Sequence, residues 1–158
     1  MKNVFYYETE IGNIGIVENG TAITNLFFGN DVVPLSVRTD TMEKETPLLK
    51  KAAEEIREYL AGKRTEFDLP LAPEGTAFQL AAWEALCTIP YGETRSYKQI
   101  AEQVGRPKAC RAIGMANNRN PIAIVVPCHR VIGSNGALVG YASGLDVKAR
   151  LLDIEKRL

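Results

Sequence analysis

The most constraining feature of the chain is the run 122–131, in which an apolar segment leads directly into a proline, a cysteine, a histidine and an arginine. The apolar part, 122–126, is typical of buried backbone, and the proline that follows ends any regular pairing. Cys128 is therefore expected at the edge of a core. Such a thiol is either a small buried hydrophobe or a positioned nucleophile. The adjoining His129, the only histidine of the chain, and Arg130 favour the thiolate and hence the nucleophile.

Residues 1–70 predict a small antiparallel sheet with one helix packed on it. Three segments rich in β-formers are separated by turn dipeptides, namely 4–7, 14–17 and 22–28. Asn19-Gly20 is a strong signal for a two-residue hairpin, and 29–45 is expected to be irregular. A helix should begin after Thr46, a good N-cap before a proline, and end at Gly62. We interpret this part as a scaffold domain.

Residues 71–75, close to two prolines, predict a linker, and 76–158 a mainly helical second domain. One helix is expected from Thr76 to Cys87. Ser96 opens a capping box for a helix ending near Val104, a second helix should follow Pro107 and end near Asn117, and a last helix should begin near Val147. The central pair forms a helix-turn-helix, a pattern typical of DNA-binding proteins. The predicted fold class is α/β, of the α+β kind.

Charge is distributed unevenly along a chain whose net charge is zero. Residues 1–73 hold 8 basic and 12 acidic side chains, a net −4, whereas 74–158 hold 11 and 7, a net +4. Within 95–130 only Glu102 opposes a basic set made of Arg95, Lys98, Arg106, Lys108, Arg111, Arg119 and Arg130. This asymmetry indicates either one oriented anionic partner or an ordinary solvated helical face.

The second helix of the predicted pair has small residues on either side of one arginine. Readers of the major groove normally use large polar side chains, but here Arg111 stands among Ala109, Ala112, Gly114 and Ala116. This composition favours a close approach to the minor groove, with Arg111 inserted into the base stack. Close helix packing, with Arg111 in a salt bridge, is the alternative.

Three cysteines without pair spacing argue against both a zinc cluster and a disulfide framework. An odd cysteine count fits a reducing compartment, no apolar run reaches membrane-spanning length, and the N-terminus has no signal core. We therefore expect a cytoplasmic protein that needs no metal, no cofactor and no membrane.

Cys128 and His129 are neighbours in sequence, so their side chains diverge. A direct hydrogen bond between them is awkward, and activation of the thiol is expected to run through a bridging water or a bend in the chain. A carboxylate could orient His129. Glu155 is the candidate, because the C-terminal helix must fold back on the core.

Several short motifs, in this order, resemble those of the O6-alkylguanine-DNA alkyltransferases, the methylated-DNA–protein-cysteine methyltransferases. The stretch from Asn120-Pro121 to Val131 is similar to their active-site signature. Five further segments agree, namely 89–94, 96–97, 111–114, 140–141 and 148–155. The resemblance is close over 76–158 and extends to 1–75 in layout only.

This resemblance implies a role for each matching residue. Cys128 matches the alkyl acceptor, and His129 and Glu155 match the network that promotes its thiolate through a water. Tyr97 matches the tyrosine that contacts the extruded guanine, and Asn120 the residue that braces the active-site turn. The remaining implied positions contact DNA or the flipped base: Arg111, Tyr97, Val131, Tyr141, Ala142, Ser143, Ala109, Ala112 and Arg130.

The implied function is direct reversal of DNA alkylation. The protein would flip O6-methylguanine, and O4-methylthymine, out of double-stranded DNA and transfer the alkyl group irreversibly to Cys128, once per chain. It would act as a monomer; the sequence leaves cooperative binding on DNA open. Ser143 departs from a glycine common in relatives, which bears on tolerance of bulky groups.

Three other functions compete with this one. A non-catalytic lesion binder of the same fold would lack the acceptor cysteine, so Cys128 argues against it. A cysteine hydrolase would turn over many times without DNA. A transcription factor would need more base-reading side chains than the lone arginine of the second helix.

Overall fold

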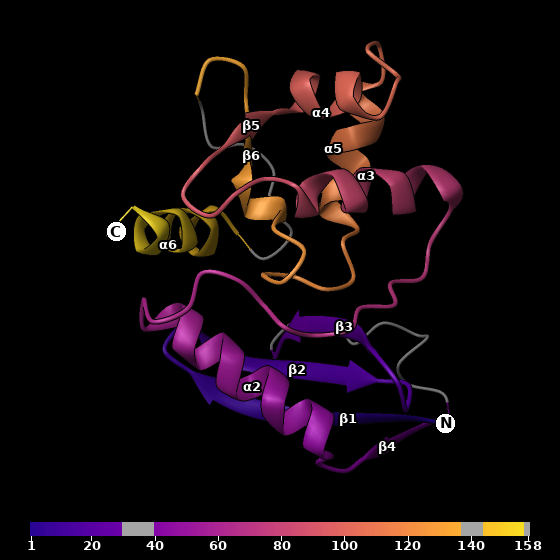
Figure 1. The fold of residues 1–158 in the computed structure, drawn as a ribbon, viewed down its shortest axis with the longest axis vertical. Helices are drawn as coiled ribbons and strands as arrows, with labels where there is room; N and C mark the ends of the chain where they lie inside the picture. Colours follow the sequence, from indigo (N-terminus) through magenta and orange to yellow (C-terminus); the bar gives the residue numbers. More distant parts are fainter. Residues whose placement is uncertain (30–39, 137–143, 157–158) are drawn as a thin grey trace. The chain divides into compact units, whose positions relative to one another are not determined.

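The computed structural model describes residues 1–29, 40–136 and 144–156, and the chain divides into two compact units, Met1–Glu74 and Gly75–Leu158 (Figure 1). The α+β fold class predicted from the sequence is confirmed. Within the described ranges, no helix combines the length and apolarity that crossing a bilayer requires.

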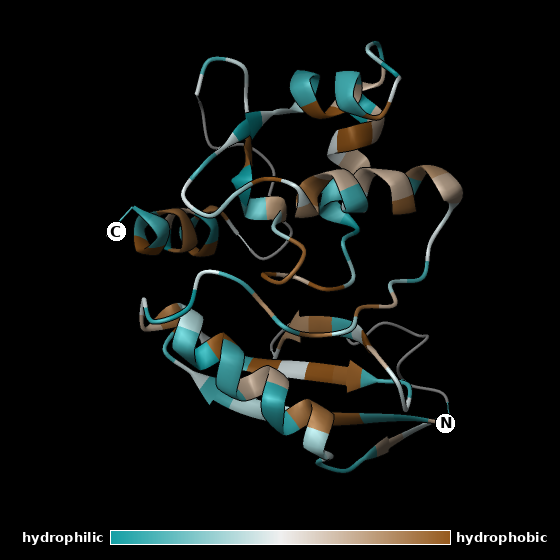
Figure 2. Ribbon diagram, in the orientation of Figure 1, coloured by the Kyte–Doolittle hydropathy of each residue, from teal (hydrophilic) through white to brown (hydrophobic). Residues whose placement is uncertain are grey.

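The first unit is a four-stranded sheet in the order β3-β2-β1-β4 with α2 on one face. Neighbours β1 (Lys2–Thr9), β2 (Gly12–Glu18) and β3 (Ile23–Phe28) are antiparallel. Helix α2 (Pro47–Leu60) is capped by the Thr46 side chain and buries its apolar stripe. Figure 2 shows the hydrophobic character concentrated on β2 and β3. The core forms where the inward-facing side chains of the strands, every second residue, pack against the apolar face of α2, on which side chains recur every three or four residues.

Two features of this unit differ from the sequence prediction. Asn19-Gly20 does not form a two-residue hairpin, because the Asn19 side chain accepts hydrogen bonds from the backbone N–H groups of Thr21 and Ala22 (3.0 Å each) and closes a four-residue loop. Strand β4 (Thr41–Glu43) was expected to be irregular but pairs in parallel with the start of β1. A strand of three residues is too short to show an alternating hydrophobic pattern, and its pairing partner lies far away in the sequence.

The second unit contains the predicted helix-turn-helix, formed by α4 (Tyr97–Gln103) and α5 (Cys110–Asn118). A capping box begins α4, as the sequence indicated, and a second capping box begins the preceding α3 (Ala77–Cys87), for which the sequence had indicated only a start at Thr76. Trp83 is buried and donates from Nε1 to the Ala116 carbonyl at 2.8 Å, which joins α3 to α5. Helix α5 begins later than predicted, after a turn closed by Ala109 N–H on the Arg106 carbonyl (2.9 Å).

Three short elements complete this unit. The 3-10 helix η1 (Cys128–Arg130) leads into β6 (Val131–Ile132), which pairs in parallel with β5 (Arg95–Ser96). Because β5 runs directly into α4, this pairing ties the start of the helix-turn-helix to the end of η1. Helix α6 (Leu145–Glu155) begins two residues before the predicted start and packs against η1.

Candidate functional site

The loop before Cys128 is held by one side chain. Asn120 donates from Nδ2 to the Val126 carbonyl (2.8 Å) and accepts at Oδ1 from the Ile122 N–H (3.0 Å). The apolar run is buried at alternate positions, and Ile124 has φ +72°, an uncommon conformation for a β-branched residue. Such strain persists only where the surroundings over-determine it. The two hydrogen bonds of Asn120 therefore hold the strained turn that precedes Cys128 in place.

Cys128 opens η1 with 5% of its surface exposed, and His129 beside it is fully buried. The sulfur thus lies at the edge of the core. A substrate group must therefore enter the site to reach the Cys128 sulfur.

Glu155 connects α6 to this turn and to the segment before β5. His129 Nε2 lies 2.7 Å from Glu155 Oε2. The Arg130 guanidinium donates to both carboxylate oxygens, from Nε at 2.9 Å to Oε1 and from Nη2 at 3.1 Å to Oε2. The backbone N–H of Gly92 adds a further bond to Oε1 at 3.0 Å. The contact between Glu155 and His129 that the sequence indicated is present, on a side chain with several partners.

These contacts assign the state of the His129 ring. Burial lowers the pKa of His129, with Arg130 and Lys148 acting in the same direction and the bond to Glu155 opposing them. The imidazole is therefore neutral at physiological pH. A carboxylate only accepts, so Nε2 carries the proton, and the buried Nδ1 carries the lone pair.

Arg130 corrects one expectation from the sequence. It was assigned to DNA contact, but it is 7% exposed, and its Nη1 donates to the Ile89 carbonyl at 2.7 Å. Its guanidinium also lies over the Tyr91 ring, 5.7 Å from the centroid. The charge of Arg130 is used inside the fold as the counter-ion of Glu155 and does not belong to the basic surface.

A second polar chain links the helix-turn-helix to Cys128. Asn117, buried on α5, donates from Nδ2 to the Cys128 carbonyl at 3.1 Å and also hydrogen-bonds Tyr97. Burial raises the pKa of Tyr97, Cys128 raises it further, and the Asn117 bond opposes both. Tyr97 therefore stays protonated and can donate. The sequence analysis missed Asn117, although its position four residues after Ile113 places it on the buried face.

Lys148 is the other site residue to which the sequence analysis gave no role. It is fully buried on α6 and donates from Nζ to the Val131 carbonyl at 2.6 Å. Burial lowers the pKa of Lys148, and an electrostatic interaction with Cys128 raises it in opposition. Its spacing from Glu155, seven residues along one helix face, was the signal that could have revealed it. The predicted pocket backbone at Val131 is thus in contact with Lys148.

The remaining predicted residues lie on α5, at its N-cap (Ala109), or outside the described ranges. Arg111 is exposed, and Ala109 and Ala112 are half-buried. Tyr141, Ala142 and Ser143 fall within 137–143, which the structure does not describe. Across 1–29, 40–136 and 144–156 no cluster of three or more His, Cys, Asp or Glu side chains could hold a metal ion.

Comparison with known proteins covers both units. Residues 77–157 match the family model described as the 6-O-methylguanine DNA methyltransferase DNA-binding domain, and 4–73 match its ribonuclease-like domain. A Methanosarcina barkeri methylated-DNA–protein-cysteine methyltransferase is 51% identical over 149 residues, which are 94% of each chain. The chain belongs to the methylated-DNA–protein-cysteine methyltransferase family.

Two further members of this family match nearly the full length of the chain. The constitutive methylated-DNA–protein-cysteine methyltransferase of Bacillus subtilis is 51% identical, over 94% of this chain and 92% of its own. A crystal structure of Mycobacterium tuberculosis OGT in complex with DNA matches with a TM-score of 0.90 and 44% identity, over 98% of this chain and 92% of that one. The alkyltransferase resemblance expected from the motifs is thus confirmed at the level of family.

Proposed function

We propose that this protein repairs alkylated DNA by transferring the O6-alkyl group of guanine to Cys128, and that each chain reacts once. The observation that carries the proposal is the buried His129–Glu155 pair, 2.7 Å apart, whose histidine follows the buried Cys128 in the same 3-10 helix. Family membership supports the reaction class, because relatives at about half identity are named for it.

The transfer begins with removal of the thiol proton. His129 is neutral, so its Nδ1 lone pair takes the Cys128 proton through a bridging water. Glu155, which hydrogen-bonds both His129 and Arg130, stabilises the imidazolium that forms. The buried Lys148 ammonium provides positive charge near the sulfur.

The thiolate then attacks the saturated alkyl carbon. A sulfur–carbon bond forms, the carbon–O6 bond breaks, and its electron pair goes to the guanine. Tyr97, protonated and held by Asn117, donates a hydrogen bond to the leaving base. The proton that His129 took from the thiol returns to the base by way of Tyr97 or water, so that guanine and His129 both end neutral. The thioether has no easy leaving group, so water does not regenerate Cys128, and no metal or cofactor is required.

Access to the site requires the base to leave the helix, because 5% exposure of Cys128 excludes attack on a stacked guanine. Helix α5 would lie in the minor groove, with the exposed Arg111 filling the gap left by the base. Methyl groups on thymine O4 present the same chemistry and would also react. One chain contains every residue this scheme uses, so a monomer suffices.

The deciding experiment is mass spectrometry of peptides after mixing the protein with duplex containing O6-methylguanine. We expect one methyl per chain on the peptide containing Cys128 and none on those containing Cys87 or Cys110. Cys128→Ala should bind the duplex and leave it methylated. Repeated turnover would support a hydrolase instead, and binding by the wild-type chain without transfer would support a lesion-recognition protein.

A further inference from the structure

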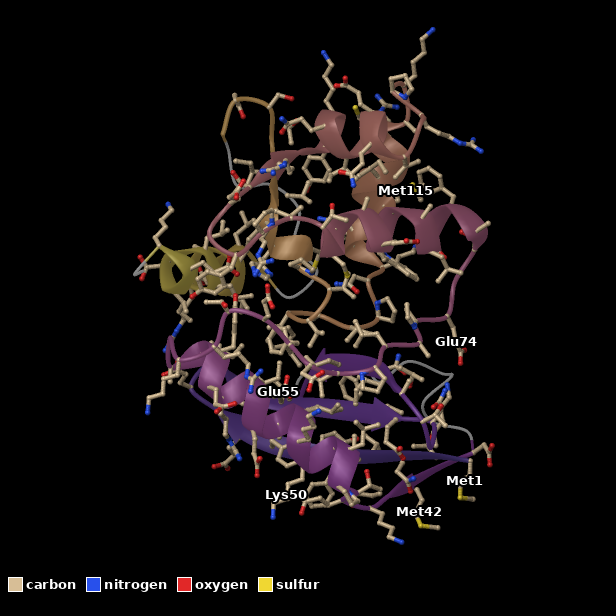
Figure 3. All side chains as sticks on the ribbon, viewed as in Figure 1. Met1, Met42, Lys50, Glu55, Glu74 and Met115 are labelled. Carbon is tan, nitrogen blue, oxygen red and sulfur yellow. The ribbon has the colours of Figure 1, made fainter. Side chains whose placement is uncertain are left out.

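An exposed methionine projects from the helix that carries Arg111. Met115 on α5 is 59% exposed, although its neighbours Ile113 and Ala116 are buried in the core of the unit (Figure 3). A single exposed apolar side chain does not mark a contact surface by itself, so what matters is which residues lie beside Met115 on the helix. The alkyl-transfer scheme above does not use Met115.

Met115 shares one line of the helix surface with two polar residues. Positions 111, 115 and 118 are four and three residues apart, so their side chains lie on one face of α5. Arg111 and Asn118 are both exposed. We call Arg111, Met115 and Asn118 the α5 stripe. It presents a cation, an apolar wedge and an amide in a row, while Ala112 and Gly114 on either side are half-buried and small.

The charges around the stripe select its partner. Besides Arg111, the segment 97–119 contains one acidic residue, Glu102, and four exposed basic residues, namely Lys98, Arg106, Lys108 and Arg119. This density of positive charge is complementary to the phosphates of a nucleic acid and not to an apolar protein surface. Minor-groove proteins combine the same elements, since they read the groove with arginine and asparagine and insert methionine or similar wedges between base steps.

We propose that Met115 is a second wedge, which enters the minor groove beside the arginine and unstacks a base step next to the extruded nucleotide. The rise between Arg111 and Met115 along the helix is about 6 Å, from 1.5 Å per residue. That separation lies between one and two base steps of about 3.4 Å, which is where the step next to the vacated position lies. Arg111 thus fills the gap, and Met115 holds the neighbouring step open. This inference rests on the proposed function for the presence of an extruded base.

The test compares Met115→Ala with Met115→Leu, which keeps an apolar wedge, and with Met42→Ala, the same substitution at a 48% exposed methionine on β4 of the first unit. Alanine favours helix at an exposed position, so folding should be unaffected. Fluorescence anisotropy with methylated duplex should show affinity about three- to tenfold weaker for Met115→Ala, from lost apolar burial. Met115→Leu should retain most of the affinity, and Met42→Ala should match the wild-type chain.

A second readout reports the unstacking itself. 2-Aminopurine placed one or two steps from the lesion should brighten when wild-type protein binds and brighten less with Met115→Ala. Equal affinity and equal brightening for the two proteins would overturn the wedge. So would a change of self-association in Met115→Ala with DNA binding intact, because the stripe would then join copies of the chain.

The two proposals fail separately. Affinity and fluorescence are measured on DNA that has not reacted, using Cys128→Ala as the background for every variant. If the wild-type chain left Cys128 unmethylated while affinity and brightening still depended on Met115, alkyl transfer would be wrong and the wedge would stand. If transfer occurred but neither signal depended on Met115, the wedge alone would be wrong.

Discussion

Glu155 combines a structural and a chemical task in one side chain. Its carboxylate is 1% exposed and accepts hydrogen bonds from His129, Arg130 and the Gly92 backbone. A buried ion pair of this kind contributes little net stability, but removing one partner leaves a desolvated charge. The orientation of His129 and the fold of the second unit therefore depend on the same group.

We expect Glu155→Gln to lower the free energy of unfolding by about 3–5 kcal/mol, because Arg130 stays buried without its counter-ion. The methyl-transfer rate should fall about 100-fold, within the range for general-base contributions. Chemical denaturation and single-turnover kinetics measure the two effects. Glu58→Gln is the matched control, since that carboxylate is 49% exposed and its pair with Arg64 contributes at most about 1 kcal/mol. Equal losses in both variants would contradict the role of Glu155.

The single histidine makes the pH dependence of stability attributable. Burial holds the pKa of His129 below its usual 6.5, so below that pH the unfolded chain binds a proton that the folded chain rejects. Stability from this group is complete above about pH 6.5 and is lost as pH falls toward the lower folded value. Denaturation between pH 8 and pH 5 should give a flatter profile for His129→Gln than for the wild-type chain. Parallel profiles would contradict a neutral buried His129.

Single residues also mark where sequence reasoning succeeds and fails. The identities and order of the residues around Cys128 were enough to single out the thiol and its histidine. Glu155 was inferred from the expectation that the C-terminal helix folds back on the core and from the family resemblance. Arg130 was misplaced because a charged residue beside a motif looks the same whether it faces solvent or a buried carboxylate 25 residues away. Tertiary burial, which decides between the two, leaves no local signal.

Among the helices and strands, the sequence predicted those elements whose ends are fixed by interactions between residues close in the chain. Helices α2, α3 and α4 each begin at an N-cap residue that can be recognised in the sequence. The side-chain oxygens of these residues accept hydrogen bonds from backbone N–H groups in the first turn of each helix, namely those of Thr46, Thr76 and Ser96. Strands β4, β5 and β6 have two or three residues each and exist only through pairing with distant segments. Such pairing has no periodicity to read.

Helix α5 offers a test that separates stability from function. A Cβ added at Gly114 would lie 3.9 Å from Tyr97 Cε1, an ordinary contact, so Gly114→Ala should fold and gain about 0.5–1 kcal/mol from helix propensity. The added methyl group lies between α5 and the tyrosine proposed to contact the base. We therefore expect a higher melting temperature together with slower transfer from methylated duplex. Glu54→Ala, on the exposed face of α2, should leave transfer unchanged. Unaltered transfer in Gly114→Ala would mean that this space is not used.

Across the whole molecule the two units differ in charge, and the basic one contains the helix-turn-helix. If three to five of the exposed basic side chains near α4 and α5 contact phosphates, the slope of log K against log salt should be about −2.7 to −4.5, from about 0.9 counterions released per contact. Lys108→Gln should reduce the magnitude of this slope by about one and weaken binding to methylated and unmethylated duplex alike. Lys63→Gln, on the acidic first unit, should leave the slope unchanged. Equal slopes for the two variants would place Lys108 outside the phosphate contacts, whereas a shift in Lys63→Gln alone would assign DNA contact to the first unit.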